Sequence, residues 1–446
     1  MQTMLPSSLP ASSLVETNAS RWLHALTALM ILVTLAYPFI RVSGFLSQEV
    51  STSASYTEGS LLVQLIYGPT FLVAGLVCWR YGRWTIEVWL RSNLFLLALT
   101  LWALASVLWS PYPTVTLKRS IQLIGLVLVG TCLALPQLRA THWTRILCVS
   151  LTTLLIISLL FVIFMPHIAV DTIRDDGWRG ILWHKNLLGM AACFSTLLWL
   201  YRGLSRDTSA LTALTGMTFT FFMVVMSRSS TALVTCLFGC LVYLFFRRHY
   251  IGGTQQRLLS ALYLLISLMA GGLIFFTVFG RLPSIKDLLT PIIVLLGKDP
   301  DLTGRTDIWQ LVLMNAYQYP LQGIGYGAFW LGAGSPSQYI IDILHWVPLQ
   351  AHNGYVDILN ELGFIGFGLF SGLIIWHTIM LIQLMRIDRE QAALHSAFFL
   401  MTLLSNLSES QFFRGLTFQN CLFIFSVLIV ANLVARHGTK SSSHPA

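Results

Sequence analysis

The chain has 446 residues, of which 55% are hydrophobic and only 10% are charged, and its formal net charge is +9. Soluble globular domains carry about 25% charged residues, so this composition excludes a soluble globule. The basic residues lie between apolar runs and form no continuous patch, which argues against a nucleic-acid partner. The seven cysteines lie in or beside apolar runs without metal-ligand spacing, so we expect buried thiols, no disulfides and no metal site.

Apolar runs of about 17–25 residues recur along the chain, and they lack the alternation that a membrane barrel requires. The predicted fold is therefore an all-α polytopic membrane protein, with about 12 transmembrane helices and one large periplasmic segment that carries short helices. The predicted spans are residues 24–40, 61–79, 93–109, 120–136, 146–165, 186–201, 209–226, 230–246, 258–279, 363–384, 391–407 and 418–435.

These spans divide the chain into a few regions. We expect a cytoplasmic tail (1–22), the first nine transmembrane helices (23–279), the large periplasmic segment (280–352), three further transmembrane helices (353–435) and a second cytoplasmic tail (436–446). Nearly every short turn on the expected cytoplasmic side is basic, and the positive-inside rule then predicts that both termini are cytoplasmic.

The expected outer side also carries basic residues, grouped in four places. They lie at Lys118-Arg119, in the loop 171–189, at Arg228 and in the segment 280–352. Several stand within a turn of a predicted helix start, where the helix dipole favours anions, so we predict an outward-facing anion site. Interfacial snorkelling is the alternative, and we prefer it for Lys286 and Lys298.

The loop 171–189 brings Arg179, His184, Lys185 and Asn186 to the entrance of a predicted membrane helix. Glycines flank Arg179, so the backbone there can approach a bulky ligand closely. A purely structural basic loop is the alternative. Together with the other basic groups on the same side, the pattern favours a cavity for a phosphorylated lipid head group.

The segment 280–352 contains one clear helix, predicted from Asp307 to about Tyr319, with Thr303 or Thr306 as its cap and Pro320 as its end. A glycine-rich turn follows at 323–327. This turn is not a nucleotide-binding loop, because no strand precedes it and no Lys-Ser/Thr pair ends it.

His352 stands at the start of a predicted helix, with Asn353 as the expected N-cap. The positive end of a helix disfavours the imidazolium form, so a neutral ring could accept a proton from a hydroxyl group. The alternative is an interfacial residue that only binds the next loop. Asp357 and Glu361 share one face of the following helix. We interpret them as structural or as partners of nearby arginines, with Glu361 nearly opposite His352.

Several motifs occur in an order that resembles a known family. They are Trp109-Ser110-Pro111 with Lys118-Arg119, Gly177-Trp178-Arg179-Gly180, His184-Lys185-Asn186 with Gly189, Gly304-Arg305-Thr306-Asp307-Ile308-Trp309, Gly323 with Gly325-Tyr326-Gly327-Ala328-Phe329-Trp330, and Ala351-His352-Asn353-Gly354-Tyr355. The chain resembles the O-antigen ligase/polymerase (Wzy/WaaL) superfamily from about residue 100 to about residue 410, most closely its ExoQ-type exopolysaccharide polymerases. Looser matches lie at 226–231 and at Ser408-Glu409-Ser410.

The resemblance implies a glycosyltransferase of the bacterial inner membrane that uses neither metal nor cofactor. It would transfer a glycan from undecaprenyl diphosphate to an acceptor hydroxyl at the periplasmic face, with inversion, and so polymerise repeat units. The implied partners are the lipid-linked oligosaccharide, the acceptor, membrane lipid and other polysaccharide export proteins. A ligase that transfers the finished glycan to lipid A–core is the alternative. A transporter of lipid-linked sugars is a third hypothesis, disfavoured because the chain has no internal repeat.

The residues divide by the role expected of them. His352 is the expected catalytic base. The expected ligands of the donor diphosphate are Arg179, Arg305, Lys185, Arg119 and Arg228. The expected supporting residues are His184, Asn186, Asn353, Tyr355, Tyr326 and Glu409. The aromatic residues Trp178, Trp183, Tyr326 and Trp330 either stack on sugars or belong to an interfacial belt.

Overall fold

The structure, a computed structural model, describes residues 18–36, 61–135, 137–138, 140–171, 176–182, 184–248 and 305–441. The predicted span 258–279, Arg174, Trp183 and the first part of the predicted periplasmic segment lie outside these ranges. The described part is almost entirely helical. Its one sheet is a two-stranded antiparallel pair, β1 (Val170–Asp171) and β2 (Gly177–Trp178), in which Val170 pairs with Trp178. The predicted all-α polytopic class is confirmed.

The elements follow one another along the chain with short connections. The first half contains α1 (Asn18–Ile31), the π-helix η1 (Leu32–Ala36), α4 (Leu61–Arg80), α5 (Gly82–Glu87), the π-helix η3 (Val88–Ser92), α6 (Leu94–Ala105), the 3-10 turn η4 (Ser106–Leu108), α7 (Pro113–Leu133), α8 (Ala140–Phe164) and α9 (Pro166–Ala169). The second half contains α10 (Lys185–Leu204), α11 (Ala210–Met226), α12 (Ser230–Arg248), α15 (Arg305–Gln318), α16 (Gln338–Leu344), α17 (Gly354–Ile387), α18 (Arg389–Ser405) and α19 (Phe418–Ser441).

Within the described residues, seven helices are long and apolar enough to cross a membrane, namely α4, α7, α8, α10, α12, α17 and α19. An eighth candidate consists of two helical segments, 82–90 and 94–108, that meet at an angle of 93°. Shorter apolar helices lie at Trp22–Leu35 and at α11, and α18 has 17 residues. Every predicted span in the described ranges therefore overlaps a helix.

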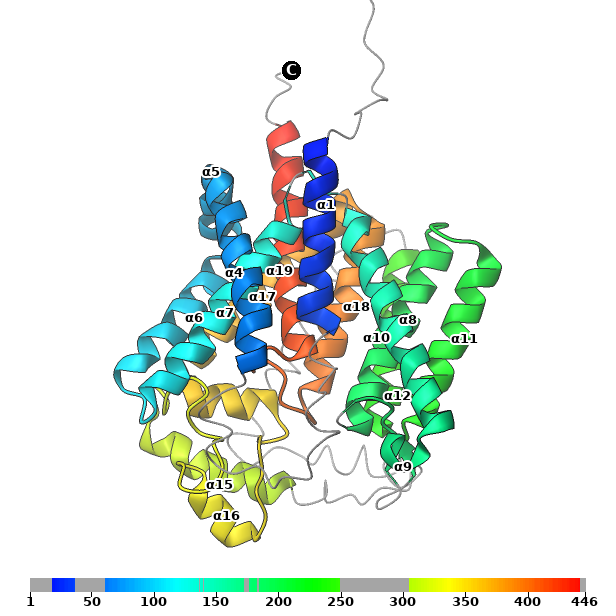
Figure 1. Ribbon diagram of the computed structural model, residues 1–446. Helices are drawn as coiled ribbons and strands as arrows, with labels where there is room; N and C mark the ends of the chain where they lie inside the picture. Colours follow the sequence, from blue (N-terminus) through cyan, green and yellow to red (C-terminus); the bar gives the residue numbers. More distant parts are fainter. Residues whose placement is uncertain are drawn as a thin grey trace, which may run out of the picture.

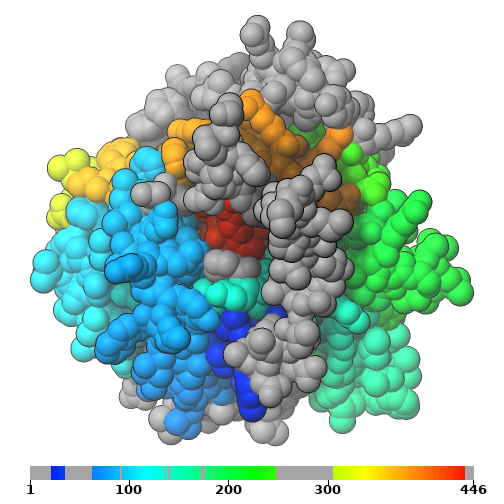
Figure 2. Space-filling view, turned by 90° about the horizontal axis from the view of Figure 1, so that it is seen from above, coloured from blue at the N-terminus to red at the C-terminus, as the bar shows by residue number. Residues whose placement is uncertain are grey.

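The helices form a bundle around α18 and α19 (Figure 1). Helices α4, α6 and α7 lie on one side of this centre, and α8, α10, α11 and α12 lie on the other. Seen along the bundle, red residues of α19 lie at the centre between the blue residues of α4 and the green residues of α11 and α12 (Figure 2). The start of α1 and the end of α19 lie at one end of the bundle, and α15 and α16 lie at the other (Figure 1).

Helix α7 begins earlier than the predicted span at 120. Pro113 occupies its first turn, where a missing backbone N–H costs nothing, so the helix starts at that proline. Lys118 and Arg119 consequently lie inside the helix, whereas the predicted span places them at its opening.

Helix α17 is two helices that meet at Gly363, whose φ of 66° and ψ of −171° are not helical. A short helix, 354–362, ends there, and the predicted span begins at the same residue. The break follows from close packing, because a Cβ on Gly363 would stand 2.3 Å from the carbonyl oxygen of Leu321. The loop before α16 is hydrogen-bonded on both sides of the break, from the Ile324 N–H to the Asn360 oxygen (3.1 Å) and from the Phe364 N–H to the Pro320 oxygen (2.7 Å).

A small apolar core joins α15, α16 and the short helix 354–362. It is separate from the main core of the bundle and includes Ile308, Val312, Phe329, Ala351 and Val356. Ala351 and Val356 belong to this core on either side of His352, so burial of apolar side chains fixes the backbone that carries the histidine.

Candidate active site

Glu409, in the turn between α18 and α19, lies at the centre of a polar cluster. Its Oε1 accepts a hydrogen bond from Asn186 Nδ2 at 2.9 Å, and its Oε2 accepts one from Gln350 Nε2 at 2.9 Å. His352 Nδ1 lies 3.4 Å from Oε2, and Arg305 Nη2 lies 3.8 Å from Oε1. We call these five residues the Glu409 cluster. Four segments that are far apart in the sequence meet in it.

The loop that carries His352 is fixed to the turn that carries Glu409. The Asn353 N–H donates to Ser410 Oγ (3.0 Å), and the Gly354 N–H donates to the Asn406 carbonyl oxygen (2.9 Å). The Asn353 side chain accepts hydrogen bonds from the N–H groups of Tyr355 and Val356, so the predicted N-cap is confirmed. His352 itself has a left-handed backbone with φ of 53°, which turns its side chain out of the path of the helix.

The start of α10 supplies the second wall of the cluster. His184 is the N-cap of this helix, and its Nδ1 accepts a hydrogen bond from the Asn186 N–H at 3.2 Å. His184 therefore acts through the backbone, while the Asn186 side chain reaches Glu409. Lys185 is the first residue of α10 and is half-buried.

The turn between α11 and α12 lies against the same region. Arg228 is exposed in this turn, as predicted, and its φ is 49°. Ser408 Oγ donates to Thr231 Oγ1 at 3.2 Å, which joins the turn to the segment that carries Glu409. A Cβ on Gly189 of α10 would stand 2.7 Å from Ser227 Oγ, so α10 packs tightly on this turn.

The electrostatic state of Glu409 follows from its neighbours. Burial alone would raise the pKa of its carboxyl, but the hydrogen bond and charge of His352, the charge of Arg305 and the amide of Asn186 outweigh burial. The pKa is therefore held below the ordinary value of 4.5, and the group is a carboxylate at neutral pH. The His352 side chain is 28% exposed and that of Arg305 is 22% exposed, so the cluster is open to a ligand on one side.

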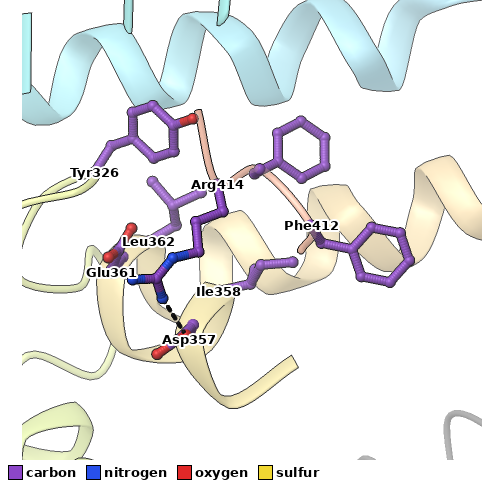
Figure 3. A pocket seen from close by; sticks show the side chains of 8 residues that line it. Tyr326, Asp357, Ile358, Glu361, Leu362, Phe412 and Arg414 are labelled. Carbon is purple, nitrogen blue, oxygen red and sulfur yellow. Dashed lines mark hydrogen bonds and ion pairs between the residues drawn. The ribbon is translucent and has the colours of Figure 1, made fainter. Parts of the chain in front are cut away.

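A second polar group surrounds the short helix 354–362. Asp357 Oδ1 accepts from Trp330 Nε1 (2.7 Å), and its Oδ2 accepts from the Ala351 N–H (3.3 Å) and forms an ion pair with Arg414 Nη1 (3.1 Å). Arg414 Nη2 also donates to the Leu349 carbonyl oxygen. Figure 3 shows this ion pair beside a small cavity with room for about one water molecule. Of the two interpretations of Asp357, as a structural residue or as a partner of a nearby arginine, the ion pair with Arg414 supports the second.

Arg119 and Glu361 hold the glycine-rich turn from two sides. Glu361 Oε2 accepts from the Gly327 N–H at 2.8 Å, and Arg119 Nη1 donates to the Gly327 carbonyl oxygen. Gly323, Gly325 and Gly327 all have positive φ, as a tight turn requires. Arg119, expected as a ligand of the donor, is thus engaged with the backbone. We call Arg119, Asp357, Glu361 and Arg414 the backbone-holding network.

The remaining predicted residues make contacts in other parts of the structure. Arg179 follows β2, where its Nε donates to the Ile168 carbonyl oxygen at 2.7 Å. Tyr355 is buried, and its hydroxyl donates to the Leu403 carbonyl oxygen. Tyr326 and Trp330 are each only 2% exposed, so neither can stack on a sugar. Trp178 is half-buried and packs edge-on against Phe222.

The structure adds residues that the sequence analysis did not assign to the site. Gln350 binds Glu409 directly, and Arg414 holds the backbone just before His352. Asp357 holds the same stretch of backbone, because its carboxylate accepts a hydrogen bond from the Ala351 N–H. Among the residues that the structure describes, no three His, Cys, Asp or Glu side chains are placed to hold a metal ion.

Comparisons with known proteins bear on the same residues. Residues 215–371 match the O-antigen ligase family model, a segment that includes Arg228, Arg305 and His352 but ends before Glu409. The exopolysaccharide production protein ExoQ of Rhizobium meliloti (strain 1021) is 24% identical over 302 residues. That match spans 64% of this chain and 64% of the length of that relative. Both matches confirm the resemblance that the motifs predicted, to the O-antigen ligase/polymerase superfamily and, within it, to ExoQ.

Proposed function

We propose that the protein is an inner-membrane glycosyltransferase that takes a glycan from undecaprenyl diphosphate and transfers it to an acceptor hydroxyl at the periplasmic face. The product would be a growing exopolysaccharide or surface polysaccharide. The observation that carries the proposal is the pairing of His352 with the ionised Glu409, with Arg305 beside them. A base and a cation side by side, both partly open to solvent, are the two groups that this transfer needs.

The His352–Glu409 pair suits a general base. Nδ1 lies 3.4 Å from the carboxylate oxygen Oε2 and 3.2 Å from Gln350 Nε2. We assign the ring proton to Nδ1, where it points at the negative oxygen, and the Gln350 amide then donates to Glu409 alone. Nε2, on the other side of the ring, is then the acceptor for the hydroxyl proton. As the acceptor oxygen bonds to the anomeric carbon, the bond from that carbon to the diphosphate oxygen breaks and His352 becomes an imidazolium. Glu409 stabilises this cation, and such a base contributes about 10²–10⁴-fold to the rate.

The leaving diphosphate needs fixed positive charge. Arg305 and Lys185 are the first residues of α15 and α10, and helix N-termini favour anions through their free N–H groups and dipole. Arg228 lies in the turn that packs on α10, and Arg179 precedes α10 in the chain. We therefore propose Arg305 and Lys185 as the direct ligands of the diphosphate, with Arg228 and Arg179 in support. Arg119 has a different role, because its guanidinium holds Gly327.

A ligase that transfers a finished glycan to lipid A–core is the second candidate, favoured by the O-antigen ligase family match. It shares the donor chemistry and differs in the acceptor. The resemblance to ExoQ favours the polymerase.

The first experiment supplies the protein, in nanodiscs, with a lipid-diphosphate-linked oligosaccharide from the host and without added metal or nucleotide. A ladder of repeat-unit multiples, formed without lipid A–core, is the result expected of a polymerase. A single product that requires lipid A–core would identify the ligase.

His352→Ala should abolish the products in the same assay while labelled donor still binds. His345→Asn is the matched control, because His345 is the exposed C-cap of α16, has a left-handed backbone that Asn tolerates, and lies outside the Glu409 cluster. Full transfer by His352→Ala would refute the assignment of the base.

A further inference from the structure

A cavity of about 520 Å³ lies at the same end of the bundle as α15 and α16. Its walls come from the connection between α6 and α7, the second half of α15 and the loop before α16. The polar and aromatic residues in its lining are Trp109, Tyr319, Tyr339, Asn315, Gln318 and Gln322. None of the residues that line it is charged. We call this cavity the carboxamide groove.

The walls of the carboxamide groove are held in place by hydrogen bonds. The Tyr339 hydroxyl donates to the Leu311 carbonyl oxygen of α15 at 2.6 Å, and Asn315 Nδ2 donates to Asn360 Oδ1 at 2.7 Å. The Tyr112 hydroxyl, in the connection between α6 and α7, donates to the Gly334 carbonyl oxygen, in the loop before α16, at 3.0 Å. The groove is thus formed before any ligand enters, as binding sites for small molecules usually are.

The groove also offers polar groups that are ready to bind. Gln318 and Gln322 are exposed, and their side-chain amides make no hydrogen bond to another residue in the described ranges. A carboxamide both donates and accepts, which matches a pair of neighbouring hydroxyl groups. Tyr319, 41% exposed, presents an aromatic ring that can pack against the C–H face of a sugar.

We propose that the carboxamide groove binds an uncharged part of the acceptor saccharide, an inference that rests on the proposed function. Helix α15 carries Arg305 at its start and Gln318 at its end, so the two sites are separated by about 20 Å along the helix. An acceptor whose terminal hydroxyl lies at His352 therefore reaches the groove with sugars further along its chain.

The lining argues against other occupants. A diphosphate would bind at Arg305 rather than in a groove without cations. A lipid tail would leave Gln318 and Gln322 facing alkyl groups without hydrogen-bond partners, which costs free energy. Sugar hydroxyl groups can form hydrogen bonds with the amides of Gln318 and Gln322, and the C–H face of a sugar can pack against the Tyr319 ring.

The test measures the binding of labelled, lipid-free oligosaccharides, prepared by partial hydrolysis of the host's own extracellular polysaccharide, to the full protein in nanodiscs. Tyr319→Ala should raise the Kd roughly fivefold to tenfold, and the double variant Gln318→Ala with Gln322→Ala should raise it by a similar factor. Tyr317→Ala is the matched control, because Tyr317, in the last turn of α15 and two residues before Tyr319, is 59% exposed and does not line the groove. Unchanged binding in the groove variants, an equal loss in Tyr317→Ala, or no binding to the parent protein would overturn the proposal.

Transfer kinetics separate the acceptor from the glycan of the donor. Tyr319→Ala should raise KM for the acceptor and leave KM for the lipid-linked donor unchanged, and a rise in donor KM alone would overturn the acceptor assignment. His352→Ala should bind the oligosaccharide with the parent Kd while transferring nothing. If His352→Ala still transfers and the groove variants still lose binding, the groove stands as a saccharide site and the catalytic proposal fails.

Discussion

Two polar groups flank the short helix 354–362, and they use charge differently. In the Glu409 cluster, side chains bind one another, and His352 and Arg305 keep faces that are open to solvent. In the backbone-holding network, the charged side chains bind the peptide groups of Gly327, Leu349 and Ala351. We infer from this difference that the first group is the one proposed to react with a ligand, while the second fixes the loops that carry it.

The sharpest test of this division removes the charge of Glu409. Glu409→Gln should lower transfer by about 10²–10⁴-fold, because the amide cannot stabilise the imidazolium of His352, while the protein stays folded because the side chain keeps its size. The rate of product formation tests the expected loss of transfer, and a thermal unfolding curve tests whether the variant stays folded. A variant with parental activity would show that His352 works without its carboxylate.

A change in the backbone-holding network should mainly lower the stability of the protein. Asp357→Ala leaves the Arg414 guanidinium, the Trp330 N–H and the Ala351 N–H without their acceptor, and we expect a loss of about 3–5 kcal/mol in unfolding free energy. Denaturation in nanodiscs measures this. Asp342→Ala, at an exposed acid on α16, should change the stability by less than about 0.5 kcal/mol. Equal losses in the two variants would show that the contacts of Asp357 contribute no more stability than an exposed acid does.

Gly327 tests the contact between the glycine-rich turn and α7. Its φ is 69°, and a Cβ there would stand 2.2 Å from Arg119 Cδ. Gly327→Ala should cost about 1–3 kcal/mol, part of it from the backbone and part from the clash. Gly334→Ala isolates the backbone part, because Gly334 has φ of 75° with nothing within 4 Å of its Cβ position. If both variants lose the same stability, the contact with Arg119 contributes nothing.

The smallest expected effect concerns pH. The pKa of Glu409 in the folded protein lies below its ordinary value of 4.5, so its carboxylate stabilises the fold above that value, and this contribution is lost as the pH falls through the lower folded value. The difference in Tm between the parent and Glu409→Gln should therefore shrink as the pH falls below about 4.5. Asp342→Asn serves as the control. A difference that narrows already at pH 6 would contradict the lowered pKa.

The sequence was a good guide to features with a local cause. Long apolar runs predict helices wherever they occur, Asn353 caps the helix that follows it, and Gly363 marks the start of a span because only a glycine fits there. Arg228 falls in the expected turn. Ser408-Glu409-Ser410 matches the family and Glu409 is an expected supporting residue, but no local pattern indicates that its carboxylate is the common partner of Asn186, Gln350, His352 and Arg305.

The contacts that the sequence does not predict join residues that are far apart in the chain. Asn186 and Glu409 are 223 positions apart, and Arg414 reaches back to Asp357 and to Leu349, so neither pairing leaves a periodic signal. In the sequence, Arg414 looks like any interfacial arginine in a turn. Only the structure shows that its partner is the buried carboxylate of Asp357. The predicted span starts at 120 and so puts Arg119 before the helix. Because α7 starts at Pro113, Arg119 lies within the helix and its guanidinium binds Gly327.

The attachment of the His352 loop to the turn between α18 and α19 has a consequence for biosynthesis. During synthesis the chain emerges from its N-terminal end, and the residues that bind Asn353 and Gly354 are made after α17. A nascent chain that has inserted every helix up to α17 therefore carries the histidine without its carboxylate. In the proposed mechanism the reactive centre is completed only when α18 and the turn after it have been added, so we expect a chain that ends before Glu409 to be inactive.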